Sequence, residues 1–291
     1  MSFLQLRNAG LFVILKRTAK GFSDHDLSTY AAALAYRALF SIFPFLLFLM
    51  ALLGFLNLPA FFDWLREQAA LVLPPVAMQQ VDPVIDQLQQ SEGGLMSIGI
   101  VLALWTASIG VRALMNAMNK VYEVQESRAT WKLFLLSVLY TIGLAIMMLL
   151  AAGFMTLGPQ VMSWVASQVG LEQVLVTLWA WIRWPLAILL LMLAVALIYY
   201  ATPDVQQEFR FITPGSVLAV IAWLGASVGF GIYVQNFANY NATYGSIGAI
   251  IVLLLYFYIS SAVLLLGAQL NASIEHASVA GKDEGDKHPE G

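Results

Sequence analysis

Two arginines stand inside apolar stretches of the chain, where a charged side chain is costly. Arg37 lies about six residues into the stretch that begins at Ala31, roughly 9 Å at the helical rise per residue. Arg112 lies at a comparable depth in a second stretch. A guanidinium keeps its charge and binds phosphate or carboxylate through paired hydrogen bonds. Either both side chains extend to the polar boundary, or they face a hydrated site that an anionic group can visit.

Carboxamides gather near the same ends of the apolar stretches. They are Asn116, Asn119, Gln269 and Asn271. We expect them to complete, with the two arginines, one inward-facing substrate site. No Asp or Glu occurs inside the apolar stretches, so no acid there can neutralise the arginines.

A second polar group, without charge, follows another apolar stretch. It comprises Gln235, Asn236, Asn239, Asn241 and Tyr244. These side chains either satisfy the backbone of a turn or form the outer mouth of a pathway. Pro44 lies near the middle of the first stretch, where it removes a backbone donor, and it is predicted to act as a hinge.

Catalytic and metal-binding patterns are weak. His25 stands between Asp24 and Asp26, but the other two histidines, His276 and His288, lie near the C-terminus, and cysteine is absent. Metal-dependent phosphodiester hydrolysis needs clustered His and Asp ligands. We therefore expect no metal site, no cofactor and no catalytic residues, and we read residues 23–26 as a helix start.

The elements that position these residues follow from composition. Of 291 residues, 60% are hydrophobic and 11% are charged, whereas soluble domains carry about 25% charged residues. A water-soluble enzyme is excluded, and the net charge of −3 argues against nucleic acid as a partner. The sequence predicts an all-α, polytopic membrane protein.

Six segments are long and apolar enough to span a membrane. They lie at about 36–56, 95–115, 134–158, 182–201, 213–237 and 246–270, within a membrane domain of residues 31–272. Gly225 and Gly229 have the spacing that lets helix backbones approach closely.

The flanking segments are also predicted. Residues 1–30 form a cytoplasmic amphipathic segment, and residues 273–291 form a disordered cytoplasmic tail. Between spans one and two, an external loop contains two amphipathic helices, around 61–73 and 76–90. All of the 14 Lys and Arg residues except Arg66 and Arg183 fall on one side, so both termini are predicted to be cytoplasmic.

Three motifs resemble the YihY/BrkB family of bacterial inner-membrane proteins. The first is AALAY at 32–36 followed by LFSIFP at 39–44, and the second is WTAS at 105–108 with GVRALMNAMN at 110–119. The third is NYNATYGSIGA at 239–249, continued by LLGAQLNA at 265–272.

The resemblance covers about residues 21–272 and implies six spans with cytoplasmic termini. Family members have been labelled ribonuclease BN, virulence factor or envelope-integrity protein, and lipid transport has been suggested. Two positions depart from the family pattern. Arg37 stands where an uncharged residue is common, and Gln269 replaces a frequent Glu that could pair with Arg112.

The leading hypothesis is a transporter or flippase-like protein for an anionic lipid or amphiphile involved in envelope integrity. Its partners would be membrane lipids, with anionic phospholipid among them, and a protein partner or homo-oligomer stays open. The alternative is a non-transporting scaffold for envelope machinery. Ribonuclease activity is not expected, because the necessary ligands are missing.

Overall fold

The structure is a computed structural model of the whole chain. It describes residues 10–55, 63, 66–67, 70, 78, 82–83, 86, 95–156, 158–169, 172–207, 209–236, 240–277 and 287. Some side chains inside the helices are not described. They are those of residues 11, 43, 46–55, 95–100, 102–103, 155–156, 169, 172–174, 235–236, 240–247 and 249. The described part is helical and contains no strand.

The helices follow one another along the chain, and most of them are long. They are α1 (Leu11–Asp24), α2 (Leu27–Phe55), α5 (Leu95–Val121), α6 (Thr130–Thr156), α7 (Gly158–Val169), α8 (Glu172–Ala201), α9 (Pro214–Asn236) and α10 (Tyr240–Ala277). α2 continues through Pro44 without a break. α10 extends into the predicted tail as far as Ala277.

Four segments are long and apolar enough to cross a membrane: Thr130–Phe154, Leu175–Ala201, Pro214–Val234 and Ile250–Ala277. They coincide with predicted spans three to six. The long helices α2 and α5 occupy the ranges predicted for spans one and two but are not among these four segments, so six crossings stay a prediction. Within a strongly apolar stretch of 18 residues in each of the four spans, only 11–17% is buried inside the protein, which leaves most of the apolar surface of these stretches for lipid.

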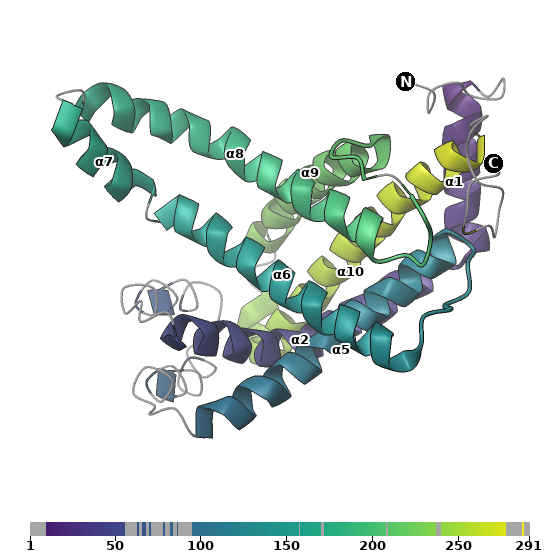
Figure 1. Cartoon of the computed structure of the whole chain (residues 1–291), viewed down its shortest axis with the longest axis horizontal. Helices are drawn as coiled ribbons and strands as arrows, with labels where there is room; N and C mark the ends of the chain where they lie inside the picture. Colours follow the sequence, from purple (N-terminus) through teal and green to yellow (C-terminus); the bar gives the residue numbers. More distant parts are fainter. Residues whose placement is uncertain are drawn as a thin grey trace.

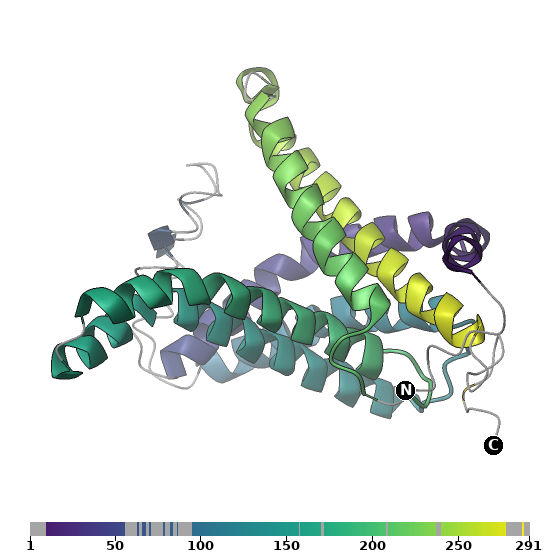
Figure 2. The ribbon, with the colours of Figure 1, turned by 90° about the horizontal axis from the view of Figure 1, so that it is seen from above.

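The helices diverge from a common end. α2 and α5 run antiparallel beside each other, and the α9–α10 hairpin leaves the remaining helices at a steep angle (Figures 1 and 2). α6, α7 and α8 form a second arm (Figure 1). The main core cluster lies where the arms meet and includes Leu27, Met118, Val121, Tyr199 and Leu265.

Close approach between helices occurs at glycines other than the predicted pair. A Cβ on Gly215 would overlap the carbonyl oxygen of Gly267 and the side chain of Asn271, so α9 and α10 are nearly in backbone contact there. The predicted pair, Gly225 and Gly229, has open space at the Cβ position. The prediction that this pair brings two helices of the chain together is wrong, because no described atom of a neighbouring helix faces either glycine, although Ser227 between them contacts Tyr256 of α10.

α1 lies against the C-terminal part of α10. Ile14 is buried against Leu270 and Ile274, while Phe12 and Leu15 are exposed. An exposed apolar face beside basic residues is typical of a helix that lies at a membrane surface.

The described residues of the 57–94 segment contain one ion-pair cluster. Arg66 contacts Asp63 at 3.6 Å, Asp82 at 3.3 Å and Asp86 at 2.6 Å. The remainder of the two helices predicted at 61–73 and 76–90 lies outside the described residues.

Candidate functional site

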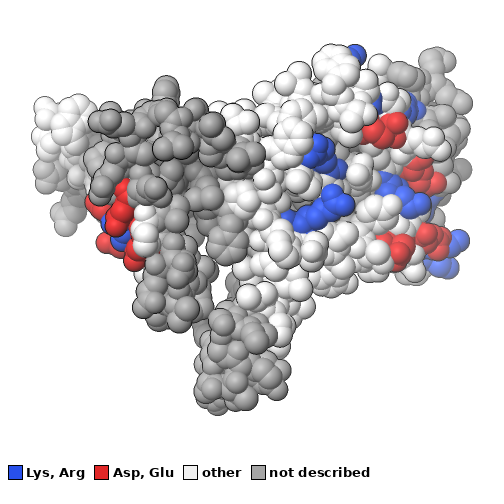
Figure 3. Space-filling model, turned by 90° about the horizontal axis from the view of Figure 1, so that it is seen from below, with Lys and Arg blue, Asp and Glu red and all other residues white. Residues whose placement is uncertain are grey.

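Charged side chains gather at the end where the helices converge. Figure 3 shows red and blue groups at the end that holds α1 and a smaller red and blue group near the opposite end, while no red group lies on the described surface between them. This distribution agrees with a protein that crosses a membrane between two polar layers. The converging end contains both an ion-pair network and a pocket.

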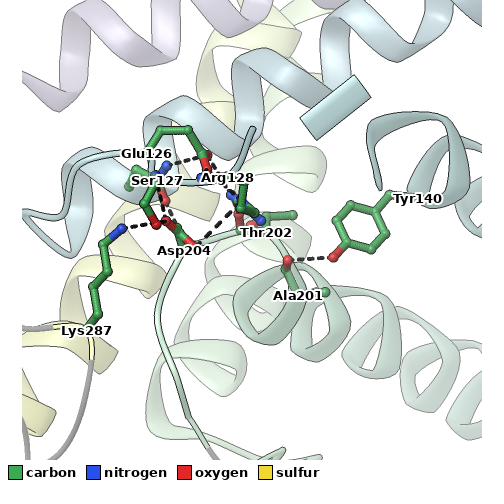
Figure 4. A network of polar contacts seen from close by, with 9 residues as sticks. Glu126, Ser127, Arg128, Tyr140, Ala201, Thr202, Asp204 and Lys287 are labelled. Atoms are coloured by element: carbon green, nitrogen blue, oxygen red, sulfur yellow. Dashed lines mark hydrogen bonds and ion pairs between the residues drawn. The ribbon is translucent and has the colours of Figure 1, made fainter. Parts of the chain in front are cut away.

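The network joins the loop after α5 to the loop after α8. Arg128 donates hydrogen bonds of 2.7 Å to both carboxylate oxygens of Glu126 and one of 3.0 Å to the carbonyl of Thr202 (Figure 4). Its Nε also lies 3.7 Å from Asp204. The side chains of Arg128, Glu126 and Asp204 are 15%, 21% and 17% exposed. The doubly hydrogen-bonded Arg128–Glu126 pair lies within the loop after α5, and the contacts of Arg128 with Thr202 and Asp204 connect this loop to the loop after α8.

Asn119, at the end of α5, completes the connection. Its side-chain amide donates to Glu126 at 2.9 Å, and its oxygen accepts from the backbone N–H of Asp204 at 2.7 Å. Burial alone would raise the pKa of Glu126, but the hydrogen bonds and charge of Arg128 and the amide of Asn119 lower it below the ordinary value. Glu126 is therefore charged at neutral pH.

Asp204 is held by three more groups. Burial would raise the pKa of this carboxyl, but Lys287 and the hydroxyl and backbone N–H of Ser127 lower it to about 2. Lys287 Nζ lies 2.5 Å from Asp204, and the Lys287 carbonyl accepts from the backbone N–H of Gln206. The tail beyond α10 thus returns to the loop after α8 at this residue.

The pocket, of about 310 Å³, lies between α1, the turn after α5 and α10. At its centre the His25 ring bridges two elements: Nδ1 lies 3.2 Å from Gln269 Oε1, and Nε2 lies 3.1 Å from Glu123 Oε1. Gln269 packs on Gly21, where a Cβ would collide with its amide. Arg17, Lys20, Asp24, Ser273 and His276 complete the lining.

Arg37 and Arg112 lie away from this pocket. Arg37 is exposed on α2, ten residues after the helix begins. Arg112 is half-buried on α5, nine residues before that helix ends, with its guanidinium 5.4 Å from the centre of the Phe134 ring. Neither guanidinium has a carboxylate partner among the residues that the structure describes.

The four carboxamides of the predicted site go to different places. Asn116 is exposed one turn from Arg112, whereas Asn119 belongs to the ion-pair network. Gln269 lines the pocket. Asn271 accepts from the backbone N–H of Gly215 at 2.8 Å and donates to Thr213 at 2.9 Å, so it helps to cap α9.

The predicted outer mouth cannot be placed. The residues of this group lie outside the part of the chain that the structure describes: Asn239 as a whole, and the side chains of Gln235, Asn236, Asn241 and Tyr244.

Sequence reasoning missed the residues with the densest contacts. Glu126, Arg128 and Asp204 come from two polar loops, and neither loop has a spacing that indicates the network. The sequence predicts a helix start at residues 23–26, and α2 begins at Leu27, but the pattern gives no sign that the His25 ring contacts Gln269 and Glu123. Among the described residues, no group of three or more His, Asp or Glu is arranged to hold a metal ion.

Comparisons with known proteins agree on one family. The sequence profile of the virulence factor BrkB family matches residues 18–290. A ribonuclease-like protein of Bacillus subtilis (strain 168), YfkH, is 36% identical over 259 residues, which cover 89% of this chain and 94% of YfkH.

Two longer relatives are named UPF0761 membrane proteins. The one from Chromohalobacter salexigens is 30% identical over 89% of this chain and 62% of its own length. The one from Xanthomonas oryzae pv. oryzae is 28% identical over 87% of this chain and 58% of its own length. The chain thus spans about three fifths of these two relatives. No solved structure matches. The family profile, which covers nearly the whole sequence, and the four apolar spans together identify this chain as a membrane protein of the BrkB family.

Proposed function

We propose that this chain moves an amphiphile with a negatively charged head, such as an anionic phospholipid, between the leaflets of the bacterial inner membrane. In this proposal both termini are cytoplasmic, and the converging end faces the cytoplasm. The observation that carries the proposal is that Arg37 on α2 and Arg112 on α5 have no carboxylate partner among the described residues.

The two arginines lie at similar heights. α2 and α5 meet where a Cβ on Gly110 would lie 3.1 Å from Ser41 Oγ. Arg37 precedes Ser41 by four residues, and Arg112 follows Gly110 by two. Because the helices are antiparallel, both arginines lie on the cytoplasmic side of this contact, about 6 Å and 3 Å from it at the helical rise.

Their depth makes an anionic ligand energetically useful. Arg37 lies about 15 Å along α2 from its first residue, and Arg112 about 14 Å from the end of α5. A charge at this depth costs several kcal/mol unless it reaches water or finds a counter-charge. A phosphate that enters between the headgroups and this level would supply the counter-charge, and guanidinium binds it through two hydrogen bonds.

The diverging arms supply a surface for the lipid tails. Exposed apolar side chains line the arms, among them Leu139 and Ile146 on α6 and Val228 and Ile232 on α9. The chain contains no phosphate-binding glycine loop of the nucleotide-binding type, so movement would be passive, driven by a gradient or powered by a partner.

The test is a lipid-scrambling assay with the full chain in vesicles that contain fluorescent phosphatidylglycerol. The wild-type protein should scramble faster than empty vesicles. Arg112→Gln and Arg37→Gln should each slow scrambling by at least about tenfold, since each removes a charged contact of about 1.5–3 kcal/mol. The matched control is Lys132→Gln, an exposed cation whose Nζ lies over the Trp131 ring.

Two results would contradict the proposal. Wild-type protein no faster than empty vesicles would favour the non-transporting scaffold. Equal rates in the wild type and both arginine variants would remove these residues from the transport path.

A further inference from the structure

A third arginine lies inside one of the four apolar spans. Arg183 follows Leu175, the first residue of the span Leu175–Ala201, by eight residues, which is about 12 Å at the helical rise. The last residue of α8, Ala201, adjoins the ion-pair network, whereas the helix begins beside α7, at the tip of the second arm (Figure 1). Arg183 therefore lies in the half of α8 that is remote from the converging end.

Arg183 and Arg66 are the two basic residues predicted on the outer side, and their surroundings differ. Arg66 contacts three carboxylates. Arg183 has no ion-pair partner in the described structure, and its guanidinium lies 5.4 Å from the centre of the adjacent Trp184 ring. Its Nε is buried and donates no hydrogen bond to any described group. An arginine in a span without an acid is a candidate contact for an external anion.

A second buried donor lies one helical turn away. Trp179 precedes Arg183 by four residues, a spacing that places both side chains on one face of α8. The indole Nε1 is buried and has no hydrogen-bond partner in the described structure. The ring is held in place, because a Cβ on Gly158 of α7 would overlap it and the Phe154 ring of α6 lies 6.3 Å away, centre to centre. The indole N–H therefore has a fixed direction.

The two donors suit one ligand that carries several acceptor oxygens. Side chains on a helix lean towards its N-terminus, so Arg183 leans towards the turn that holds Trp179. A phosphate diester has one negative charge shared by two free oxygens, which can accept from a guanidinium and from an indole N–H together. A water molecule could accept both hydrogen bonds but would leave the guanidinium without a counter-charge.

The surrounding surface indicates that the phosphate belongs to a lipid. Trp164 of α7 and Trp181 and Trp184 of α8 are exposed, and tryptophan is enriched where membrane hydrocarbon meets the headgroups. Leu178 and Ile182 are also exposed on α8. Acyl chains would cover this apolar surface while the headgroup lies at the level of the tryptophans.

We propose that Arg183 and Trp179 bind the phosphate of a membrane lipid whose acyl chains lie along the exposed face of α8. This inference goes beyond the transport proposal and does not depend on it. Arg37 and Arg112 lie on other helices, and binding at α8 requires no movement of lipid between leaflets.

The test is native mass spectrometry of the full chain released from an uncharged detergent, which measures the affinity of each bound lipid. The probe is dioleoyl phosphatidylglycerol. Dioleoylglycerol has the same acyl chains without the phosphate, and glycerol phosphate has the phosphate without the chains. Phosphatidylglycerol should bind at least about tenfold more tightly than either. The Arg37→Gln, Arg112→Gln double variant is titrated beside the wild type and should retain this site.

Further substitutions in the double variant locate the site. Arg183→Gln should weaken phosphatidylglycerol binding by at least about tenfold, because it removes the cation. Trp179→Phe keeps an aromatic ring against Gly158 but removes the indole N–H, and it should weaken binding about tenfold. Without lipid its melting temperature should not fall, since the lost donor has no partner. The control is Lys132→Gln, which removes a cation that lies 5.6 Å from the Trp131 ring and should leave the affinity unchanged.

Three results would overturn this inference. They are equal binding of phosphatidylglycerol and dioleoylglycerol or glycerol phosphate by the double variant, equal effects of Arg183→Gln and Lys132→Gln, and an unchanged affinity in Trp179→Phe. A wild-type protein that binds the lipid in this way but does not scramble it would contradict the transport proposal alone.

Discussion

The ion-pair network and the arginines of α2 and α5 use the same side chain in opposite ways. Arg128 contacts two carboxylates and a backbone carbonyl. Arg37 and Arg112 contact no carboxylate in the described structure, and Arg112 lies against an aromatic ring instead. A guanidinium whose partners are all within the protein holds two segments together, whereas one without an acid is available to an external anion.

The cost of burying a charge explains why most of the described ion pairs lie at the converging end. Glu126, Arg128 and Asp204 sit in loops near water, where carboxylates can be accommodated. Acids are absent from the predicted spans, because a carboxylate in lipid is costly. Stability and ligand recognition are therefore expected to respond to different arginines, which the following variants test in order of decreasing effect on stability.

Arg128→Ala should destabilise the protein most. It leaves Glu126 and Asp204 mostly buried without their shared cation, at a cost of about 3 kcal/mol. Unfolding in detergent, followed by circular dichroism, measures the change. Lys132→Ala, four residues later and exposed, is the control. Equal effects of the two variants would show that the network does not hold the loops.

Gly215→Ala should destabilise by about 2 kcal/mol, since the added methyl group overlaps the backbone of Gly267. Gly225→Ala makes the same change on the same helix in open space and should be neutral or stabilising by up to about 1 kcal/mol. The same unfolding experiment compares them. A larger loss of stability in Gly225→Ala than in Gly215→Ala would contradict the close contact between α9 and α10 at Gly215.

Asp204 should make stability depend on pH in acid. Its folded pKa of about 2 lies below the ordinary 3.8, so its contribution is complete above about pH 4. The contribution is lost as the pH falls from about 4 towards 2, because the unfolded state then binds the proton more readily. In the Asp204→Asn variant, the melting temperature should change less with pH in this window than in the wild type. An unchanged slope would exclude Asp204 as its source.

Arg37→Gln should change stability least, by less than about 0.5 kcal/mol, because this exposed side chain has no ionic partner to lose within the described structure. Melting temperature in detergent is the measurement. A loss comparable to that of Arg128→Ala would show that Arg37 is structural and would remove the contrast between the two regions.

Local pattern predicted the long helices well. Spans three to six follow from apolar length alone, and the basic residues of α1 beside an apolar face indicated a helix outside the bundle. The network was not predictable, because Glu126 and Asp204 are distant in sequence and neither loop has a characteristic spacing.

The prediction of one carboxamide site did not consider the direction in which each side chain leaves its helix. Gln269 and Asn271 are two residues apart on one helix, so they face different sides. Gln269 accordingly meets His25, while Asn271 meets Gly215. Arg112 and Asn116, four residues apart, do share a face. The sequence predicts which residues lie at one level of the membrane, but their neighbours depend on helix rotation.

The return of Lys287 to Asp204 has a practical consequence for handling the protein. An affinity tag attached within a few residues after Lys287 would lie close to this contact. A bulky or acidic fusion at that position would compete with Asp204 for the lysine and loosen the loop after α8. Purification handles are better placed ahead of α1, and any comparison of melting temperatures should use protein from which a C-terminal handle has been cleaved.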